Sequence, residues 1–490
     1  MKQQIQKRNL QKCFDILSVL FILIAVHFII GMFTGKWPWS YNPYNSYLLQ
    51  ALSWIEGRLD LGQNYEYLEL AIYNNKYYVS FPPFPSYILL PFALIFKERT
   101  PEGWIAFVIM LLGAIYALRI AWELIEPGWK AVFWTTFLFI GTNILYITLD
   151  AAVWFIAQSF ATTLSLMALY YALKGKGGLS FFFWGCSVGC RPLQVLYFPI
   201  VFYLLYKYLK KKNPNHSLLS MIKQKFYWAI PVCIIAFSYM ILNYARFDNP
   251  VEFGHNYLPE FMREENGQFH ISYLANNLKS LILLPTWTDY DTLSFPRFNG
   301  FCIFLVSPLY VSYLVYYLRK IVRRQKIDGM FLFGLPCLII LHIIALCLHR
   351  TMGGAHFGHR YINDTLPYLY FGVLLFAGTY IPTQKTISPI SSKDIDICKQ
   401  PDTFIAENSI PVEDDEEENE VAVEVAEETK KENFTDLWKN DTEQFQKTDD
   451  ITEELPSVSD YTYTFHYAFF AFGVALNIVG SIVEIMRWGL

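Results

Sequence analysis

Long apolar stretches recur along the chain and alternate with polar connections. Many of them approach the roughly 20 residues that an α-helix needs to cross a bilayer. We predict membrane-spanning helices over residues 14–33, 103–123, 131–148, 152–173, 179–190, 192–208, 227–246, 300–318, 329–348, 364–382 and 462–486. The hydrophobic pattern therefore predicts an all-α polytopic membrane protein of about 11 transmembrane helices.

Two places along the chain depart from this pattern, a pair of short apolar stretches and one proline-rich stretch. Residues 179–190 and 192–208 are short, and we interpret them as a broken pair that meets at the sequence Gly-Cys-Arg-Pro, residues 189–192. Irregular backbone at membrane depth is tolerated where it lines a cavity or is buried in protein. Residues 81–96, FPPFPSYILLPFALIF, contain four prolines, which favour a kinked interfacial helix over a regular span.

The composition agrees with a membrane protein and excludes an ordinary soluble domain. Hydrophobic residues make up 54% of the chain and charged residues only 17%. The eight cysteines lie mostly in or beside apolar stretches and form no CxxC motif, which favours a packing role over a metal or disulfide role.

Basic residues in the short connections predict the orientation of the chain. The leader MKQQIQKRNLQK, the sequence KGKGG at 174–178, the connection before residue 227 and the sequence RKIVRRQK at 319–326 belong to the cytoplasmic side by the positive-inside rule. The outer side then holds the loop 34–102, the turn at Asp150, the turn at Arg191, the loop 247–299 and the loop 349–364.

A separate acidic segment precedes the last apolar stretch. Residues 383–460 hold 23 acidic and 7 basic residues and few large apolar ones. Such a segment buries too little surface to offset the entropy of ordering, so we predict a disordered cytoplasmic insert. It separates a membrane domain, residues 1–382, from a final transmembrane helix within 461–490.

Several carboxylates lie in the segments assigned to the outer face. Asp60 and Glu69 belong to the first loop, and Asp150 ends a span in the sequence ITLDAAVW. An ionisable group at a membrane edge is costly unless it is paired or serves a function. The residues alone leave two alternatives open, a structural carboxylate or an acid/base group.

Basic groups share this compartment. The candidates are Arg58, Lys76, Arg191, Arg246, Arg350 and Arg360. Arg191 stands out because it lies at the helix break, and arginine binds phosphate bidentately. The alternative is that its side chain reaches the lipid headgroups.

The late outer loop carries three histidines, His349, His356 and His359. Their spacing does not match a zinc pattern, so we favour substrate contact by His359, Arg360 and Asp364 over a metal site.

The first outer loop is dense in aromatic residues, Tyr78 among them, and the second carries His255 in the sequence NPVEFGHNY. Tyrosine and tryptophan line sugar sites, but they also form the interfacial belts of membrane proteins. For His255, direct substrate contact and a place in a packed cap remain alternatives.

The order of these segments resembles that of the GT-C glycosyltransferases, specifically the protein-mannosyltransferase and aminoarabinose-transferase-like superfamily. The matching segments are EGRLDL and NKYYVSFPPFPSYILLP in the first loop, Asp150 in the second outer turn, GCRP at the broken pair, NPVEFGHNY, and AHFGHRYINDTLP before a late span. The resemblance covers residues 10–382. It implies a GT-C-like bundle in a cell membrane, with a cytoplasmic N-terminus and interfacial helices in the first outer loop.

The resemblance also implies an activity. It implies an inverting glycosyltransferase that moves a sugar from a polyprenyl-phosphate donor to a lipid, glycan or protein acceptor at the outer face. Asp60 or Glu69 would be the general base. Asp150 would hold the acceptor or a divalent cation, and Arg191 and Arg360 would bind the donor phosphate. The other expected substrate-binding residues are Arg58, Lys76, Tyr78, His255, His359 and Asp364.

One position departs from the family pattern. Asn42 and Asn45 stand where an early acid is expected, so either Asp60 or Glu69 has taken the base role, or the activity is altered or lost. The alternatives are a transporter or flippase of lipid-linked sugars, and a non-catalytic scaffold whose acidic insert binds a cytoplasmic partner. A transporter typically has inverted repeats, which are not apparent here. We expect no nucleic-acid partner.

Overall fold

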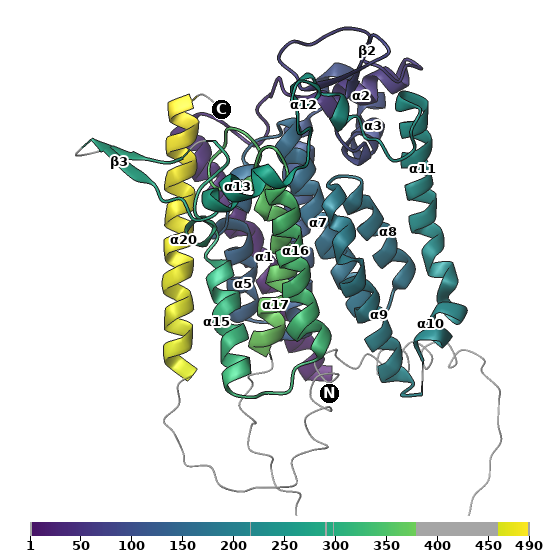
Figure 1. Cartoon of the computed structure of the whole chain (residues 1–490). Helices are drawn as coiled ribbons and strands as arrows, with labels where there is room; N and C mark the ends of the chain where they lie inside the picture. The colour runs from purple at the N-terminus through teal and green to yellow at the C-terminus, as the bar shows by residue number, and fades with distance from the viewer. Residues whose placement is uncertain (1, 216, 290–291, 297, 379–458, 489–490) are drawn as a thin grey trace, which may run out of the picture.

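The computed structural model describes residues 2–215, 217–289, 292–296, 298–378 and 459–488. The predicted acidic insert, residues 383–460, lies almost entirely outside this part of the chain. Long helices run side by side between the two ends of the molecule, and shorter elements gather at one of these ends (Figure 1).

Within the described residues, seven helical segments are long and apolar enough to cross a membrane. They include α1 (Lys2–Thr34), α4 (Glu102–Leu124), α7 (Val153–Leu173), η2 with α9 (Pro192–Tyr197 and Phe198–Lys212), α10 with α11 (Leu218–Lys225 and Ile230–Phe247), η6 with α16 (Met330–Gly334 and Leu335–Cys347), and α20 (Ser459–Trp488). These helices agree with the predicted helical membrane protein.

The four remaining predicted spans coincide with shorter helices. These are α5 with α6 (Trp129–Ile140 and Ile144–Thr148), α8 (Gly177–Val188), α14 with α15 (Ile303–Val306 and Leu309–Val322), and α17 (Leu366–Gly378). In the described chain each of these helices has fewer than 18 residues. The total of eleven crossings therefore stays a prediction.

The basic connections and the loops with candidate site residues lie at opposite ends of the bundle. The N-terminus, α10 and the end of α15 lie at one end, and α2 (Ser46–Ile55), α3 (Phe84–Phe96) and α12 (Pro259–Met262) lie at the other (Figure 1). This separation is what the charge pattern predicts. The assignment of the basic end to the cytoplasm remains a prediction from that pattern.

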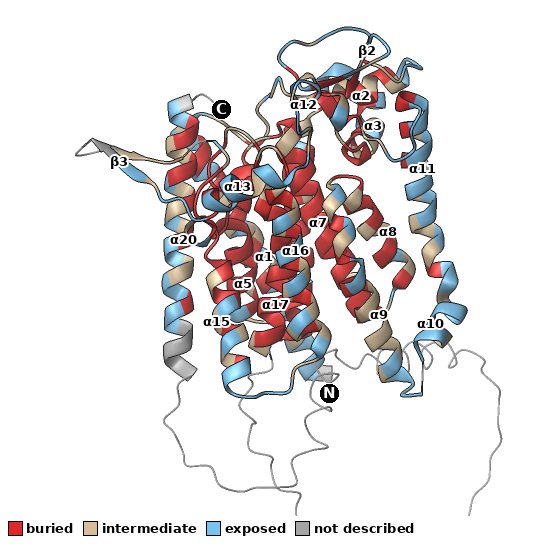
Figure 2. Cartoon of the chain, in the orientation of Figure 1, coloured by how far each residue is buried: buried red, intermediate tan, exposed pale blue. Residues whose placement is uncertain are grey.

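Helix α7 is the centre of the core. It carries no charged residue and is buried along most of its length, against α4, α8 and α17. The approach to α4 is close, since a Cβ atom on Gly113 would lie 2.4 Å from the Thr163 hydroxyl oxygen. Exposed residues instead follow the outer helices α11 and α20 (Figure 2). On α11 the exposed side chains include Ile230, Ile234 and Phe237, as expected of a lipid-facing surface.

The first outer loop contains a hairpin that the hydrophobic pattern did not predict. Strands β1 (Leu70–Tyr73) and β2 (Lys76–Val79) pair antiparallel through a two-residue turn, Asn74–Asn75. Both turn residues have positive φ, a conformation that asparagine tolerates and that two-residue hairpins require. A second hairpin joins β3 (Thr286–Asp289) and β4 (Thr292–Ser294). These two short hairpins are the only sheets in the described residues, so the chain agrees with the predicted all-α class.

Helix α3 matches the predicted interfacial helix in extent. It has 13 residues with Pro91 inside it, too few to cross a bilayer. The backbone N–H of Phe84 donates to the carbonyl of Gly189 at 3.0 Å, which ties α3 to the end of α8.

The predicted break between α8 and α9 is confirmed. Arg191 has extended backbone at φ −140°, and Pro192 starts the 3-10 helix η2. The short elements not yet named are η1 (Lys97–Arg99), η3 (Phe226–Ala229), η4 (His255–Tyr257), η5 (Ile271–Tyr273), α13 (Leu274–Ser280) and η7 (Arg360–Thr365).

Candidate functional site

Asp150 is joined to the first outer loop by Asn42. The Asn42 side-chain amide donates to Asp150 Oδ1, and the backbone N–H of Ala152 donates to the same oxygen at 3.0 Å. Asn42 Oδ1 in turn accepts from the backbone N–H of Tyr44 at 2.8 Å. The asparagine that stands where the family pattern expects an acid therefore binds the carboxylate of the second outer turn.

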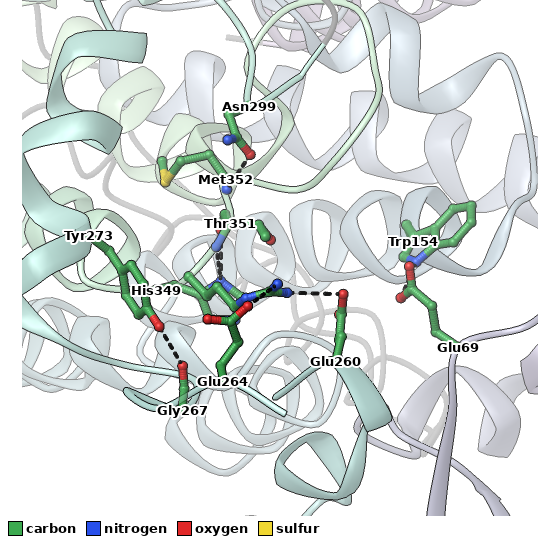
Figure 3. Close-up of polar contacts among 11 residues, drawn as sticks. Glu69, Trp154, Glu260, Glu264, Gly267, Tyr273, Asn299, His349, Thr351 and Met352 are labelled. Carbon is green, nitrogen blue, oxygen red and sulfur yellow. Dashed lines mark hydrogen bonds and ion pairs between the residues drawn. The ribbon is translucent and has the colours of Figure 1, made fainter. Parts of the chain in front are cut away.

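Glu69 reaches the start of α7. Its Oε2 accepts from Trp154 Nε1 at 2.9 Å (Figure 3). Its backbone carbonyl accepts from the Ser80 hydroxyl at 3.0 Å, across the base of the hairpin. The protein packed around the Glu69 carboxylate raises its pKa, although the side chain keeps contact with solvent. The Trp154 hydrogen bond and the charge of Arg360 oppose this rise without cancelling it.

Arg360 is buried and lies over the ring of the same indole. Its guanidinium carbon is 5.9 Å from the Trp154 ring centre. Its Nε and Nη2 donate to the carbonyl of Gly353 at 2.9 and 2.7 Å. Nη1 has no hydrogen-bond partner among the residues that the structure describes. Gly353 has φ +110°, and a Cβ atom there would lie 2.7 Å from Arg360 Nε, so this position requires glycine.

Arg191 forms a buried ion pair with Asp364. The Arg191 Nε to Asp364 Oδ2 distance is 2.7 Å. Gln158 Nε2 donates to Asp364 Oδ1 at 3.3 Å and to the carbonyl of Arg360 at 2.8 Å, so one side chain joins both residues. Gln194 Nε2 donates to the carbonyl of Asp364 at 2.8 Å. The Arg191 side chain is thus held inside the bundle rather than extended toward lipid headgroups.

The two arginines share one aromatic neighbour. The guanidinium carbons of Arg191 and Arg360 both lie 4.8 Å from the centre of the Tyr361 ring. Cation–π contact lets two positive groups remain close together in a buried place. Four of the predicted site residues, Glu69, Arg191, Arg360 and Asp364, are therefore linked through Trp154, Tyr361 and Gln158.

The histidines do not form a metal site. His255 Nδ1 lies 3.3 Å from the Ser80 carbonyl oxygen, and its ring centre lies 5.8 Å from that of His349. His359 instead lies by Ser280, with Nε2 to Oγ at 3.3 Å. Burial lowers the pKa of His255 to about 3 and that of His349 to about 4, so both rings are neutral at pH 7. The described residues contain no group of three or more His, Cys, Asp or Glu side chains placed to hold a metal ion.

Four predicted site residues lie in or near the β1–β2 hairpin and do not belong to the Trp154 cluster. Arg58 pairs with Glu56, and Lys76 Nζ lies 3.6 Å from Asp60 Oδ2. Asp60 Oδ1 also accepts from the backbone N–H of Gly62, two residues later. Tyr78 is buried against Phe247. The contacts of Asp60 are therefore with its own loop and hairpin and not with the Trp154 cluster.

An open cavity of about 460 Å³ adjoins Glu69. It lies between the first loop and α12, and its lining residues are Asn64, Glu66, Leu68, Glu69, Leu70, Ile72, Leu258, Pro259, Glu260 and Arg263. Arg350 holds the α12 side by ion pairs to Glu260 and Glu264 at 3.3 and 2.6 Å (Figure 3). The volume falls in the range of roughly 300–1,000 Å³ that is typical of small-molecule sites.

Three residues that connect this cluster, Trp154, Gln158 and Tyr361, were not among the candidates predicted from the sequence. Trp154 and Gln158 both come from the first turns of α7, one helical turn apart and therefore on one face. A glutamine in a long apolar span is the signal that could have identified Gln158. Tyr361 follows Arg360 directly, and nothing in its sequence context distinguishes it from an interfacial tyrosine.

Comparison of the chain with known protein families and with curated proteins, and of the fold with solved structures, finds no match.

Proposed function

We propose that this protein is a membrane glycosyltransferase that moves a sugar from a polyprenyl-phosphate donor to a hydroxyl group at the outer face of the membrane. One observation supports this proposal best. The Glu69 carboxylate and the Arg360 guanidinium, a base and an anion-binding group, contact the same Trp154 indole. Group transfer from a phosphate needs these two functions close together.

Glu69 would act as the general base. Its carboxylate takes the proton from the acceptor hydroxyl while the acceptor oxygen forms a bond to the anomeric carbon of the donor sugar. The bond from that carbon to the phosphate oxygen breaks, and its electron pair leaves with the polyprenyl phosphate. A raised pKa makes Glu69 a stronger base than an ordinary surface carboxylate. Its place on the cavity surface lets a hydroxyl group approach from solvent.

Arg360 and Arg191 would bind the departing phosphate. Arg360 Nη1 has no hydrogen-bond partner among the described residues, which leaves it able to donate to a phosphate oxygen. Asp364 holds Arg191, and the Gly353 carbonyl holds Arg360, so neither guanidinium needs to reorganise as charge develops on the leaving group.

The test is reconstitution of the full chain in liposomes with polyprenyl-phosphate sugars, measuring release of polyprenyl phosphate. We expect Glu69→Ala to lower the rate by about 100-fold or more, the usual contribution of a general base. Asp60→Ala is the matched control, since this carboxylate lies in the same loop but faces Lys76. We expect it to keep most of the activity.

Other outcomes decide between the alternatives. If Asp60→Ala loses the release of polyprenyl phosphate and Glu69→Ala keeps it, the base is Asp60. Movement of the intact donor across the bilayer without phosphate release would support a flippase. If no donor gives phosphate release or transbilayer movement, both activities are contradicted and the scaffold is supported.

A further inference from the structure

The charges around the Glu69 cavity suggest which acceptors fit it. The rim carries three carboxylates, those of Glu66, Glu69 and Glu260, and one guanidinium, that of Arg263. Glu260 acts on Glu69 across the cavity, because its negative charge helps to raise the pKa of the Glu69 carboxyl. Arg350 pairs with both Glu260 and Glu264 at the edge of the cavity, and with all these groups ionised the carboxylates still outnumber the guanidinium groups.

The floor of the cavity has a different character. Leu68, Leu70 and Leu258 are buried beneath it, while Asn64 and the charged rim residues are exposed. An apolar surface surrounded by hydrogen-bonding groups suits a ring with C–H faces and hydroxyl edges. A carbohydrate ring has this chemistry.

The buried arginines and the exposed rim carboxylates lie in different places around Glu69, and the rim carries one guanidinium of its own, that of Arg263. Arg360 lies beyond Trp154, in the buried cluster with Arg191, whereas Glu66 and Glu260 lie on the solvent side, around the cavity. An anionic group is therefore attracted to the buried side and repelled from the cavity. Like charges that face one another suppress binding of the wrong partner.

We propose that this cavity is the acceptor site and that it takes a carbohydrate without anionic groups, excluding acceptors that carry a carboxylate or phosphate. The identification as an acceptor site rests on the proposed glycosyltransferase function, but the charge selection is a property of the cavity and is measurable without catalysis. Glu66 and Glu260 are the specificity-determining residues.

The test measures binding of methyl glucoside and methyl glucuronide to the full chain in nanodiscs, by titration calorimetry or saturation-transfer NMR at pH 7. The two probes differ in one group, the hydroxymethyl or the carboxylate. We expect the glucoside to bind at least about tenfold more tightly. Added salt reduces the ratio because it screens the exposed rim charges.

Charge-removing variants test the assignment of the residues. We expect Glu66→Gln and Glu260→Gln each to bring the two affinities closer. Glu264→Gln is the matched control, because Glu264 also pairs with Arg350 but does not line the cavity. It should leave the ratio unchanged.

Three results would overturn the inference. They are equal binding of both glycosides, binding of neither, and an equal effect of Glu264→Gln and Glu260→Gln. A failure of the proposed transferase function gives different results from a failure of this inference. Selective binding without any release of polyprenyl phosphate would refute the transferase and leave the charge-selective cavity in place. Release without charge selection would refute only the inference.

Discussion

Trp154 contacts both charged groups of the proposed site, Glu69 and Arg360. Its indole N–H binds Glu69, its ring lies beneath the Arg360 guanidinium, and Tyr44 packs against it with ring centres 5.1 Å apart. The backbone N–H of Val153 also donates to the Tyr44 carbonyl at 2.8 Å. The first outer loop is therefore attached to α7 beside Glu69 and Arg360.

Replacing Trp154 with phenylalanine should change the pH dependence of the reaction. The aromatic ring remains, but the hydrogen bond that lowers the pKa of Glu69 is lost, so this pKa rises further. Because the base must be ionised, activity falls as the pH drops through its pKa. We expect the acidic limb of the kcat/KM profile to move to higher pH, because the charged form of Glu69 loses a hydrogen bond that favours it.

Trp104→Phe is the control for this shift, since Trp104 stacks on Trp39 at 4.7 Å and has no contact with Glu69 among its described interactions. A Trp154→Phe profile that coincides with the wild-type profile would show that the hydrogen bond does not tune the base.

At the scale of elements, close packing of α8 on α11 positions the helix break that carries Arg191. A Cβ atom on Gly185 would lie 2.7 Å from Val232 Cγ2 and 3.0 Å from Ile235 Cγ2. At Gly189 the nearest atom would be the Tyr239 hydroxyl oxygen at 2.0 Å. Small residues at such contacts allow helices in a membrane to approach closely.

Gly185→Ala should therefore destabilise the protein by about 1–3 kcal/mol, the usual cost of overpacking. Gly178→Ala is the matched control in the same helix, where the new methyl group would meet only Pro231 Cγ at 3.8 Å. Because alanine is the better helix former, this control should be neutral or slightly stabilising. Thermal unfolding of both variants in detergent measures the difference. Equal melting temperatures would mean that the α8–α11 contact adjusts without cost.

At the scale of the whole molecule, two kinds of connection occupy the two ends of the bundle (Figure 1). Lys210, Lys211 and Lys212 end α9 at one end, whereas the hairpin, α3 and α12 lie at the other. The positive-inside rule places the lysine-rich end in the cytoplasm. In this predicted orientation the Glu69 cavity faces outward.

Labelling with a membrane-impermeant maleimide tests the orientation. We expect Gln63→Cys, in the first outer loop, to react in intact cells. Asn213→Cys, at the end of α9, should react only after the cells are permeabilised. Both positions are exposed, and the unsubstituted protein controls for its own cysteines. The reverse pattern would place the cavity in the cytoplasm and contradict the proposed outer-face reaction.

The sequence by itself determined the membrane character, the positions of the long apolar helices and the break at Arg191, because bilayer crossing requires long apolar runs and proline cannot continue a helix. It also identified Glu69, Arg191, Arg360 and Asp364 as candidates, since ionisable groups beside apolar spans need a reason to be there.

Only the tertiary structure decided which of these residues meet. Asp60 and Glu69 are both carboxylates of the first outer loop and equal candidates for the base. In the structure Asp60 pairs with Lys76, whereas Glu69 binds Trp154. That outcome depends on the fold of the β1–β2 hairpin and on the position of α7. Contacts between residues far apart in the chain, such as Gln158 with Asp364, follow from packing, and no local pattern encodes them.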